Sequence, residues 1–435
     1  MSQKLELLFP AGNLEKLKYA IAYGADAVYA GVPMFSLRAR ENQFTWEDLA
    51  EAVEYCHSRG KKIYFTANIY AHNMKLKPFM AAFAKMYELK PDAYIMSDPG
   101  LIDMVRTEYP DAEIHLSVQA NNTNWAQVKF WQKMGVKRII LSRELSLKEV
   151  KEIHENCPDM ELEFFVHGAI CMAYSGRCLL SNYFSHRDPN QGTCSHSCRW
   201  EYKVFKRDVS DADLYDSTGR PEEYIPLTGE FYLEERERQG EILPIDEDEY
   251  GTYIMNSRDI CLISYLKELK DAGILSFKIE GRSKTLNYLA GVGRAYRAAL
   301  DAVEENQEYD AEKLAEELFA ISNRGYTPGF LVGNPGEHGI WFEKNGEIKE
   351  EEYLGIVREY DATRKMARLE VKNRFDLHNP VKIITPNKAF EFTIDSILDP
   401  KGESKEAAHG GSFDVWINCP EDPGEWGLVR RKVVT

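Results

Sequence analysis

The sequence predicts an α/β protein: a (β/α)8 TIM-type barrel with a cysteine-rich insertion after strand seven, plus a small C-terminal all-β barrel domain. Short apolar runs alternate eight times with amphipathic helical patterns in the first 305 of the 435 residues. Continuous apolar runs are typical of parallel strands that are buried on both faces. A doubly wound open sheet is the competing interpretation, but eight repeats favour a closed barrel.

Each predicted strand is a short run rich in Ile, Val, Leu, Phe and Tyr, bounded by Gly, Asn or Asp. These strands span residues 5–12, 27–32, 62–70, 93–98, 113–119, 138–144, 161–168 and 274–281. Each is followed by a segment whose apolar residues recur at helical spacing. These helices are predicted at residues 13–24, 46–60, 78–89, 100–109, 124–135, 146–156, 257–273 and 285–303.

The domain boundaries follow from the places where this alternation stops. Residues 1–305 form the predicted barrel, and residues 170–257 are its cysteine-rich insertion. Residues 306–344 are a connector with one helix and a turn-rich stretch. Residues 345–435 contain short β-type runs separated by Asn, Gly and Pro, which predicts the small β-barrel domain.

Composition and charge narrow the function classes. The chain has 44% hydrophobic and 29% charged residues and a formal net charge of −16. No basic start with an apolar stretch behind it marks a signal peptide, and no run approaches the roughly 20 apolar residues that span a bilayer. We therefore expect a cytoplasmic protein without membrane contact, in which thiols stay reduced. The negative charge argues against bulk binding to nucleic acid, although one basic face could still meet an RNA.

A barrel carries its active site at the carboxyl ends of its strands. We therefore expect the polar residues that follow the strands, and the insertion, to share one mouth. The catalytic candidates are Glu280 and His167. The substrate-binding candidates are Arg38, Arg40, Arg143 and Arg282, whose planar guanidinium groups suit an anion. Each arginine could instead pair with one of the many acidic residues, and Glu280 could be a structural partner of Arg282 or Lys278.

Four of the eight cysteines lie in the insertion, in the pattern Cys171-x6-Cys178-x15-Cys194-x3-Cys198. Loop-like sequence rich in Gly, Ser, Asn and Pro buries little, so a metal centre could hold it in place. Zinc sites usually have two tight Cys pairs, and only one is present here. Four thiolates at irregular spacing suit a [4Fe–4S] cluster at least as well. A thiol peptidase with Cys171 and His167 as its pair is a further alternative, although HExxH and GxSxG are absent.

The segment EFFVHGAIC, residues 163–171, and the segment YSGRCLLS, residues 174–181, resemble a known signature. So do RDPNQGTC at 187–194, FKIEGR at 277–282 and the N-terminal PAGNLEKLKYAIAYGADAVYAG. The chain resembles the collagenase-like "peptidase U" family, and within it the tRNA 5-hydroxyuridine synthesis proteins.

This resemblance implies a tRNA uridine hydroxylase that modifies the wobble uridine without oxygen. It also implies a [4Fe–4S] cluster held by four cysteines, and prephenate, a small-molecule carboxylate, as a possible co-substrate. The ligands implied are Cys171, Cys178 and Cys194, with Cys198 as the fourth and Cys261 in reserve. Two alternatives remain: a collagenase-like peptidase, and a non-catalytic RNA-binding partner with a structural metal site. The sequence leaves the oligomeric state unknown.

Overall fold

The computed structural model describes residues 4–37, 42–171, 173–199, 257–339, 341, 348–411 and 413–433. It also gives five short strands between residues 205 and 253. Arg38 and Arg40 lie outside the described residues, as does Trp200. No described helix is both long enough and apolar enough to cross a bilayer.

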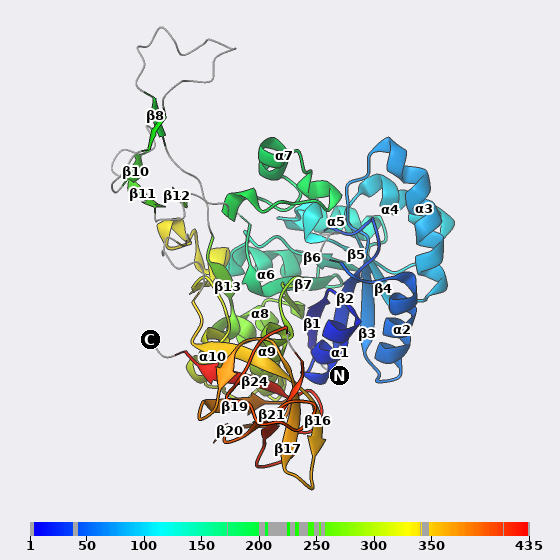
Figure 1. Cartoon of the computed structure of the whole chain (residues 1–435). Coiled ribbons are helices and arrows are strands. Elements are labelled where there is room, and N and C mark those ends of the chain that lie inside the picture. Colours follow the sequence, from blue (N-terminus) through cyan, green and yellow to red (C-terminus); the bar gives the residue numbers. More distant parts are fainter. Residues whose placement is uncertain are drawn as a thin grey trace.

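The predicted barrel is confirmed: eight parallel strands form a closed ring (Figure 1). The closure is made by the last strand, which pairs in parallel with both the first and the seventh. The strands are β1 (Glu6–Ala11), β2 (Ala27–Gly31), β3 (Lys62–Thr66), β4 (Ala93–Met96), β5 (Ile114–Leu116), β6 (Arg138–Ile140), β7 (Glu161–Ala169) and β14 (Ile274–Ile279).

Helices follow the strands and form the outer layer. Their starts are fixed by side-chain caps: Asn13 caps the first helix, and Thr45 and Ser146 form capping boxes on two others. The helices are α1 (Leu14–Ala22), α2 (Trp46–His57), α3 (Asn73–Glu88), α4 (Pro99–Glu108), α5 (Trp125–Lys133), α6 (Leu147–Asn156), α8 (Leu266–Asp271) and α9 (Leu286–Glu304).

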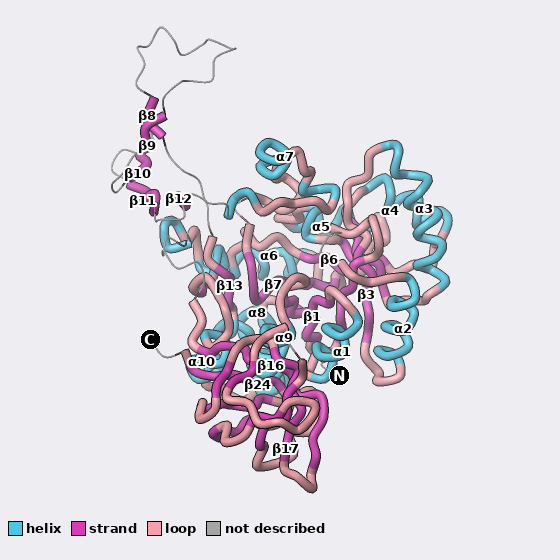
Figure 2. Tube along the Cα trace, viewed as in Figure 1, coloured by secondary structure: helices cyan, strands magenta, loops and turns pink. Residues whose placement is uncertain are grey.

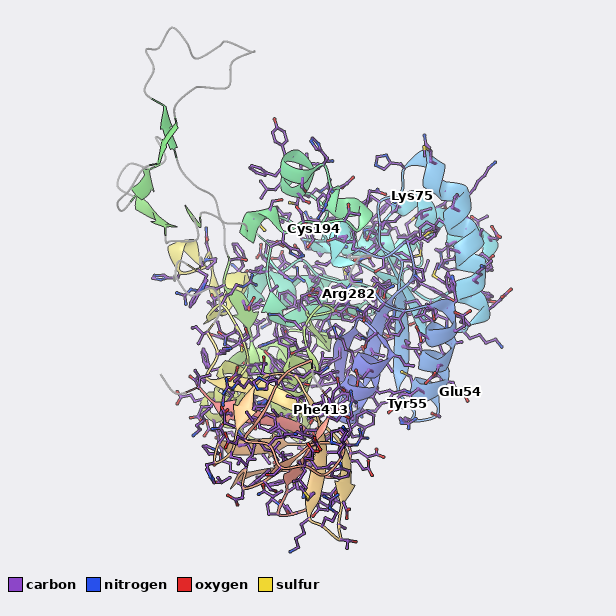
Figure 3. The ribbon with its side chains drawn as sticks, in the orientation of Figure 1. Glu54, Tyr55, Lys75, Cys194, Arg282 and Phe413 are labelled. Atoms are coloured by element: carbon purple, nitrogen blue, oxygen red, sulfur yellow. The ribbon has the colours of Figure 1, made fainter. Side chains whose placement is uncertain are left out.

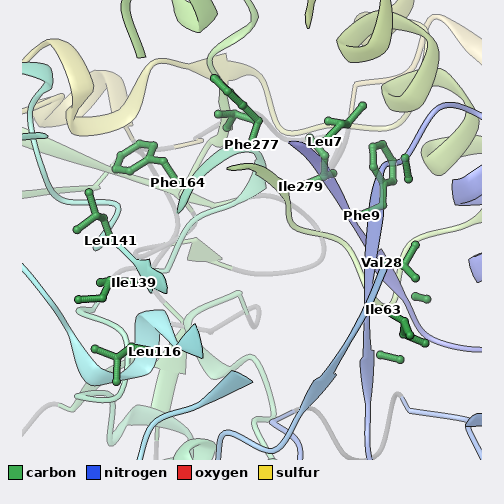
Figure 4. Packing of buried hydrophobic residues seen from close by; sticks show 14 of the residues in the cluster. Leu7, Phe9, Val28, Ile63, Leu116, Ile139, Leu141, Phe164, Phe277 and Ile279 are labelled. Atoms are coloured by element: carbon green, nitrogen blue, oxygen red, sulfur yellow. The ribbon is translucent and has the colours of Figure 1, made fainter. Parts of the chain in front are cut away.

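The main core lies between this helical layer and the barrel. Side chains such as Phe9, Val28, Phe164 and Phe277 point outward from the strands and are fully buried (Figure 4). Because side chains alternate along a strand, the intervening residues point into the barrel. A second, smaller cluster that includes Tyr29 and Phe165 fills that interior.

Charged residues fill the barrel interior toward the amino ends of the strands, where Glu6 and Arg138 begin β1 and β6. Tyr64 donates a 2.5 Å hydrogen bond to Glu6, which also accepts one of 2.5 Å from Arg138. Arg138 lies 3.4 Å from Glu163, and Lys278 donates a 2.6 Å hydrogen bond to the other oxygen of Glu163. These charges are buried but mutually paired, as buried charges must be.

The insertion leaves and returns at the end of β7. Its described part holds the short helix α7 (Leu180–Ser185) and two 3-10 turns. The prediction of one helix over residues 257–273 is wrong in its first half. Residues Asp259–Cys261 form strand β13, which pairs antiparallel with the end of β7, and the helix α8 begins only at Leu266.

This pairing anchors both ends of the insertion at the barrel rim, and Ser257 adds a 2.7 Å hydrogen bond to the carbonyl of Ile170. The strands given within the insertion are β8 (Phe205–Arg207), β9 (Tyr224–Pro226), β10 (Phe231–Glu234), β11 (Ile242–Glu247) and β12 (Thr252–Tyr253).

The C-terminal part is all-β, as predicted, and lies at the end of the barrel away from the insertion (Figure 2). Helix α10 (Ala311–Phe319) and strand β15 (Tyr326–Thr327) lead into it. Seven strands form one antiparallel sheet, and β18 (Phe375–Asp376) pairs with β22 (Ala407–Ala408) beside it. The sheet order is β20 (Ala389–Thr393), β19 (Pro380–Ile384), β24 (Leu428–Lys432), β16 (Glu351–Asp361), β17 (Met366–Val371), β23 (Val415–Asn418) and β21 (Ile397–Leu398).

A buried contact joins this sheet to the barrel. Arg430, which is only 1% exposed, donates to Asn287 on α9 at 2.5 Å and lies 3.3 Å from Glu351. Tyr23, just after α1, donates to the backbone carbonyl of Trp426 at 2.7 Å. The sheet therefore packs on α1 and α9, which leaves the opposite mouth of the barrel to the insertion.

Candidate active site at the barrel mouth

A cavity of about 350 Å³ lies at the carboxyl ends of the strands, beneath the described part of the insertion. Its walls combine strand residues such as Tyr29, Phe165 and Glu280 with residues 173–180 of the insertion. A larger cleft of about 730 Å³ lies between α1 and the C-terminal sheet, but it contains none of the predicted site residues. The mouth of the barrel is therefore the candidate site.

The four cysteines of the insertion all line this cavity. Cys171 is exposed, whereas Cys178, Cys194 and Cys198 are half-buried. None of the four forms a disulfide with another described residue. Figure 3 shows Cys194 beneath α7 and above Arg282, at the covered end of the barrel. The structure thus brings together the four thiols that the sequence singled out.

The four thiols line one cavity, and both zinc and an iron–sulfur cluster take cysteine thiolates as ligands. Among the described residues, no group of three or more His, Cys, Asp or Glu side chains is arranged to hold one metal ion. A zinc site needs four donors around one atom. Each cysteine of a [4Fe–4S] cluster binds a different iron, so its thiolates stand farther apart around a larger group. Four cysteines line the cavity, which is the number of thiolates that either group takes.

Cys261 lies elsewhere. It belongs to β13, does not line the cavity, and its sulfur lies 3.7 Å from the hydroxyl of Tyr296 on α9. Burial raises the pKa of the Cys261 thiol, which disfavours the thiolate that a metal needs. Of the two cysteines predicted for the fourth position, Cys198 is therefore the one that lines the cavity with the other three. Cys56, Cys157 and Cys419 are buried in the fold, as expected for structural cysteines.

Arg143 and Glu280 form the polar centre of the cavity wall. The guanidinium of Arg143 lies 3.8 Å from the carboxylate of Glu280 and is stacked 3.8 Å from the ring centre of Phe165. Its Nε atom is buried and has no hydrogen-bond partner among the described residues. The hydroxyl of Tyr29 lies 3.4 Å from Glu280. A buried guanidinium with an unused donor is suited to bind an anion that enters the cavity.

Two further cations line the same cavity. Arg282 is 8% exposed and donates a 2.6 Å hydrogen bond to Ser36. Lys278 lies 4.2 Å from the ring centre of Tyr29. Burial lowers the pKa of Lys278, against the opposing effect of Glu163, which accepts its hydrogen bond. With Arg177 of the insertion, which also lines the cavity, four cationic side chains therefore surround it, and Glu280 is the one carboxylate among its described lining residues.

Lys278 and Tyr29 line the cavity and were not among the site residues predicted from the sequence. Period-two alternation could have found Lys278, because residues 278 and 280 of one strand point to the same side. Of the other polar residues that follow the strands, Asn68 and Gln119 line the cavity. Asn13 and Asp98 instead cap α1 and α4.

His167 is not in the cavity. Its ring packs against Tyr288 and Tyr296 of α9 and Tyr326 of β15, with centroids 5.2 to 5.8 Å apart. Alternation from Glu163 and Phe165 would point it inward, but the strand pairing shifts register there.

Lys278 pairs with Phe165, whereas the next residue, Ile279, pairs with His167. This bulge turns the imidazole to the outer side. The catalytic role predicted for His167 therefore has no geometric support, and its pairing with Cys171 is not formed.

Gly168 makes this turn possible. Its φ is +105°, and a Cβ atom built on it would lie 2.5 Å from the backbone oxygen of Glu280. Only glycine accepts both the dihedral angle and the close approach. The bulge therefore fixes the carboxyl ends of β7 and β14 against each other, and with them the position of Glu280.

Comparison with known proteins gives two family matches. The model described as Peptidase family U32 matches residues 12–341, and the model described as Peptidase family U32 C-terminal domain matches residues 349–430.

Curated relatives match over nearly the whole length. The chain is 45% identical to "tRNA hydroxylation protein P" of Escherichia coli (strain K12), over 96% of this chain and 94% of that protein. It is 44% identical to the protein of the same name in Haemophilus influenzae, over 99% of this chain and 97% of that protein. It is also 33% identical to the "23S rRNA 5-hydroxycytidine C2501 synthase" of Escherichia coli (strain K12), over 78% of this chain and 47% of that protein.

Proposed function

The chain belongs to peptidase family U32, and from this premise we propose that it is a tRNA-modifying enzyme that hydroxylates the wobble uridine to 5-hydroxyuridine. The observation that carries the proposal is the single cavity that four cysteines share with Arg143, Lys278, Glu280 and Arg282. Relatives named for tRNA hydroxylation and for 5-hydroxycytidine synthesis support a reaction on a pyrimidine of RNA. A tRNA substrate also supports a cytoplasmic location.

A [4Fe–4S] cluster held by Cys171, Cys178, Cys194 and Cys198 is the second part of the proposal. Replacing the C5–H bond of uridine by C5–OH is a two-electron oxidation, which side chains alone do not perform. The cluster, when bound, would transfer electrons without a need for O2, and the carboxylate co-substrate would be the oxidant and the oxygen donor. The chain contributes a protected position for it, since three of these four cysteines of the insertion are half-buried.

The cations of the cavity support a small carboxylate as co-substrate, with prephenate as the proposed molecule. Arg143 has an unused buried donor, and Arg282 and Lys278 add positive charge on the same wall. A dicarboxylate would be held by charge-assisted hydrogen bonds from these groups, each stronger than a neutral one. Arg38 and Arg40 lie outside the described residues, so their predicted part in binding stays a prediction.

Glu280 is the carboxylate placed to move a proton. It lies between Tyr29 and Arg143 on the wall of the cavity, within reach of a bound base. Formation of 5-hydroxyuridine requires loss of the proton at C5, which a carboxylate can accept. A wobble base already stands in a single-stranded loop, so placing it in a cavity costs little unstacking energy. The cavity volume falls within the range of small-molecule sites.

The peptidase alternative has weaker support. It rests on the family's description, and its nominated pair, Cys171 and His167, is separated because the imidazole lies in the helical layer. The alternative of a non-catalytic RNA-binding partner predicts a protein that binds tRNA and leaves it unmodified.

One experiment separates the three. The protein, purified without oxygen, is incubated with unmodified tRNA transcript with and without prephenate, and the nucleosides are analysed by mass spectrometry. We expect a uridine that gains one oxygen atom, only with prephenate and only with cluster-loaded protein. A loaded protein that binds the transcript and leaves it unchanged would support the RNA-binding alternative. Cleavage of a collagen peptide that survives removal of iron would support the peptidase.

A further inference from the structure

Helix α7 of the insertion turns polar side chains toward the protein and apolar ones toward solvent, which is the reverse of an ordinary surface helix. Its serines face the protein: Ser181 and Ser185 each lie 2.9 Å from the hydroxyl of Ser195, which in turn lies 2.7 Å from that of Ser197. Ser181 is 1% exposed, and Ser195 directly follows the proposed ligand Cys194. The polar side of the helix is therefore used to hold the cysteine segment.

The apolar side of α7 consequently faces solvent. Tyr183 is 87% exposed, Leu179 is 65% exposed and Phe184 is 50% exposed. Tyr174, on the loop before the helix, is 51% exposed and lines the cavity, as Leu179 does. Exposed aromatic side chains gathered beside a cavity mouth are unusual on a protein without a partner there.

Positive charge accompanies these side chains. Arg177 and Arg187 flank α7 and are exposed, and no described carboxylate forms an ion pair with either. Two acidic residues, Asp188 and Asp98, accept hydrogen bonds from backbone N–H groups and not from these arginines. Asp188 accepts from the backbone of Asn190, and both oxygens of Asp98 accept backbone N–H groups. The two exposed arginines of this rim are therefore available to an anion, as far as the described carboxylates are concerned, on a chain whose net charge is −16.

This rim is also fixed to the barrel. Lys75, on α3, donates a 2.7 Å hydrogen bond to Gln191, and the backbone N–H of Tyr70 donates to Asn190 at 3.2 Å. Figure 1 shows α7 at the end of the barrel opposite the C-terminal sheet, and Figure 3 shows Lys75 and Cys194 both toward that end. We call Tyr174, Arg177, Leu179, Tyr183, Phe184 and Arg187 the α7 surface.

We propose that the α7 surface is the docking site for unpaired nucleotides of the RNA, namely those that flank the base placed in the cavity. The inference rests on the proposed function and adds to it the part of the chain that binds the strand. Aromatic rings stack on bases of any sequence, and guanidinium groups neutralise the phosphates between them. A protein partner would use the rings equally well, but it would not require exposed arginines that no described carboxylate pairs with.

The test measures binding of a fluorescent anticodon stem-loop RNA to the full-length protein, purified without oxygen, by anisotropy. The double variant Tyr183→Ala/Phe184→Ala should weaken binding by roughly tenfold or more, since each lost stacking contact is worth about 1–3 kcal/mol. Tyr183→Leu keeps the apolar bulk and removes only the ring, and it should also weaken binding. Phe413→Ala, at an exposed position of the C-terminal domain, should bind like the wild type.

The salt dependence supplies a second readout. Arg187→Gln should lower the slope of log K against log salt concentration by about 0.7, the value for one phosphate contact on a single strand. The stacking variants should leave that slope unchanged. A fully paired RNA of the same base composition should be insensitive to Tyr183→Leu, because its bases are already stacked.

The outcomes distinguish this inference from the proposed function. Wild-type affinity of the double variant and of Tyr183→Leu for the stem-loop, with iron retained, would overturn the docking site and point to a protein partner for α7. Weakened binding by these variants, together with a wild type that hydroxylates no uridine, would preserve the docking site and overturn the proposed function.

Discussion

Replacing His167 by asparagine should make the protein less sensitive to mild acid. The imidazole is completely buried among Tyr288, Tyr296 and Tyr326, and its Nε2 atom has no hydrogen-bond partner among the described residues. Burial lowers the pKa of His167 to about 3, and Asp259 only partly opposes this effect. The ring is therefore neutral in the folded protein at every pH at which the protein works.

The sign and size of the effect follow from proton linkage. The unfolded chain binds a proton at this histidine near pH 6.5, whereas the folded chain binds it only near pH 3. Between these values the unfolded state holds more protons, so the free energy of unfolding falls as the pH falls. The loss is about 1.4 kcal/mol per pH unit, or about 2 kcal/mol per histidine between pH 7 and pH 5.

His115 is a second histidine of this kind, with its pKa lowered to about 3 chiefly by burial. Wild-type protein should therefore lose about 4 kcal/mol between pH 7 and pH 5 from the two histidines, and His167→Asn only about half of that. Urea unfolding at both pH values, followed by circular dichroism, measures the difference. His72→Asn, at an exposed position, is the control and should show the full loss.

An acid-induced loss in His167→Asn as large as in the wild type would refute the assignment of a buried neutral ring. The same variant also tests the catalytic role that the sequence predicted. Because His167 does not line the cavity, iron content and hydroxylation should persist. Loss of hydroxylation with iron retained would return His167 to the mechanism.

Three further substitutions test other parts of the structure. Arg143→Lys should raise the KM for the carboxylate co-substrate about tenfold or more in steady-state kinetics, because the planar fork is lost; an unchanged KM would exclude Arg143 from binding. Arg430→Met should destabilise the protein by about 3 kcal/mol in urea unfolding, the low end for a broken buried pair, since Glu351 loses its guanidinium partner and keeps Lys382 at 3.4 Å. Addition of Glu351→Gln should restore much of this loss, and additive losses would contradict the pairing. Gly168→Ala should lower Tm and hydroxylation together, because its Cβ would displace Glu280; a wild-type Tm would show that the bulge tolerates a side chain.

The fold was predictable because its signals are local. Apolar runs of strand length, followed by amphipathic segments that begin at Asn13, Thr45 and Ser146, identify the repeating unit. Eight units then predict closure, which the pairing of β14 with both β1 and β7 confirms. The family resemblance, read from the cysteine segment and the flanking motifs, is also confirmed.

Parts of the site were not predictable because they depend on register between distant strands. A one-residue shift between β7 and β14 decides that Phe165 faces the cavity and His167 does not. The short β13 could not be told from the start of the following helix in the sequence. What makes it a strand is its pairing with β7, which lies about ninety residues earlier. Lys278 was not predicted to line the cavity because it lies within an apolar strand, and its pairing with Glu163 inside the barrel depends on a distant strand.

The central claim is that four thiols at the barrel mouth hold the redox centre of an RNA hydroxylase. Its most direct test is the visible spectrum, with iron and sulfide content, of protein purified without oxygen, for the wild type, Cys178→Ala and Cys261→Ala. We expect a brown wild type with four irons, a Cys178→Ala protein that loses the absorption and the hydroxylation of tRNA, and a Cys261→Ala protein that keeps both. A colourless wild type with one zinc per chain, or a Cys178→Ala protein that keeps its full iron content and activity, would contradict it.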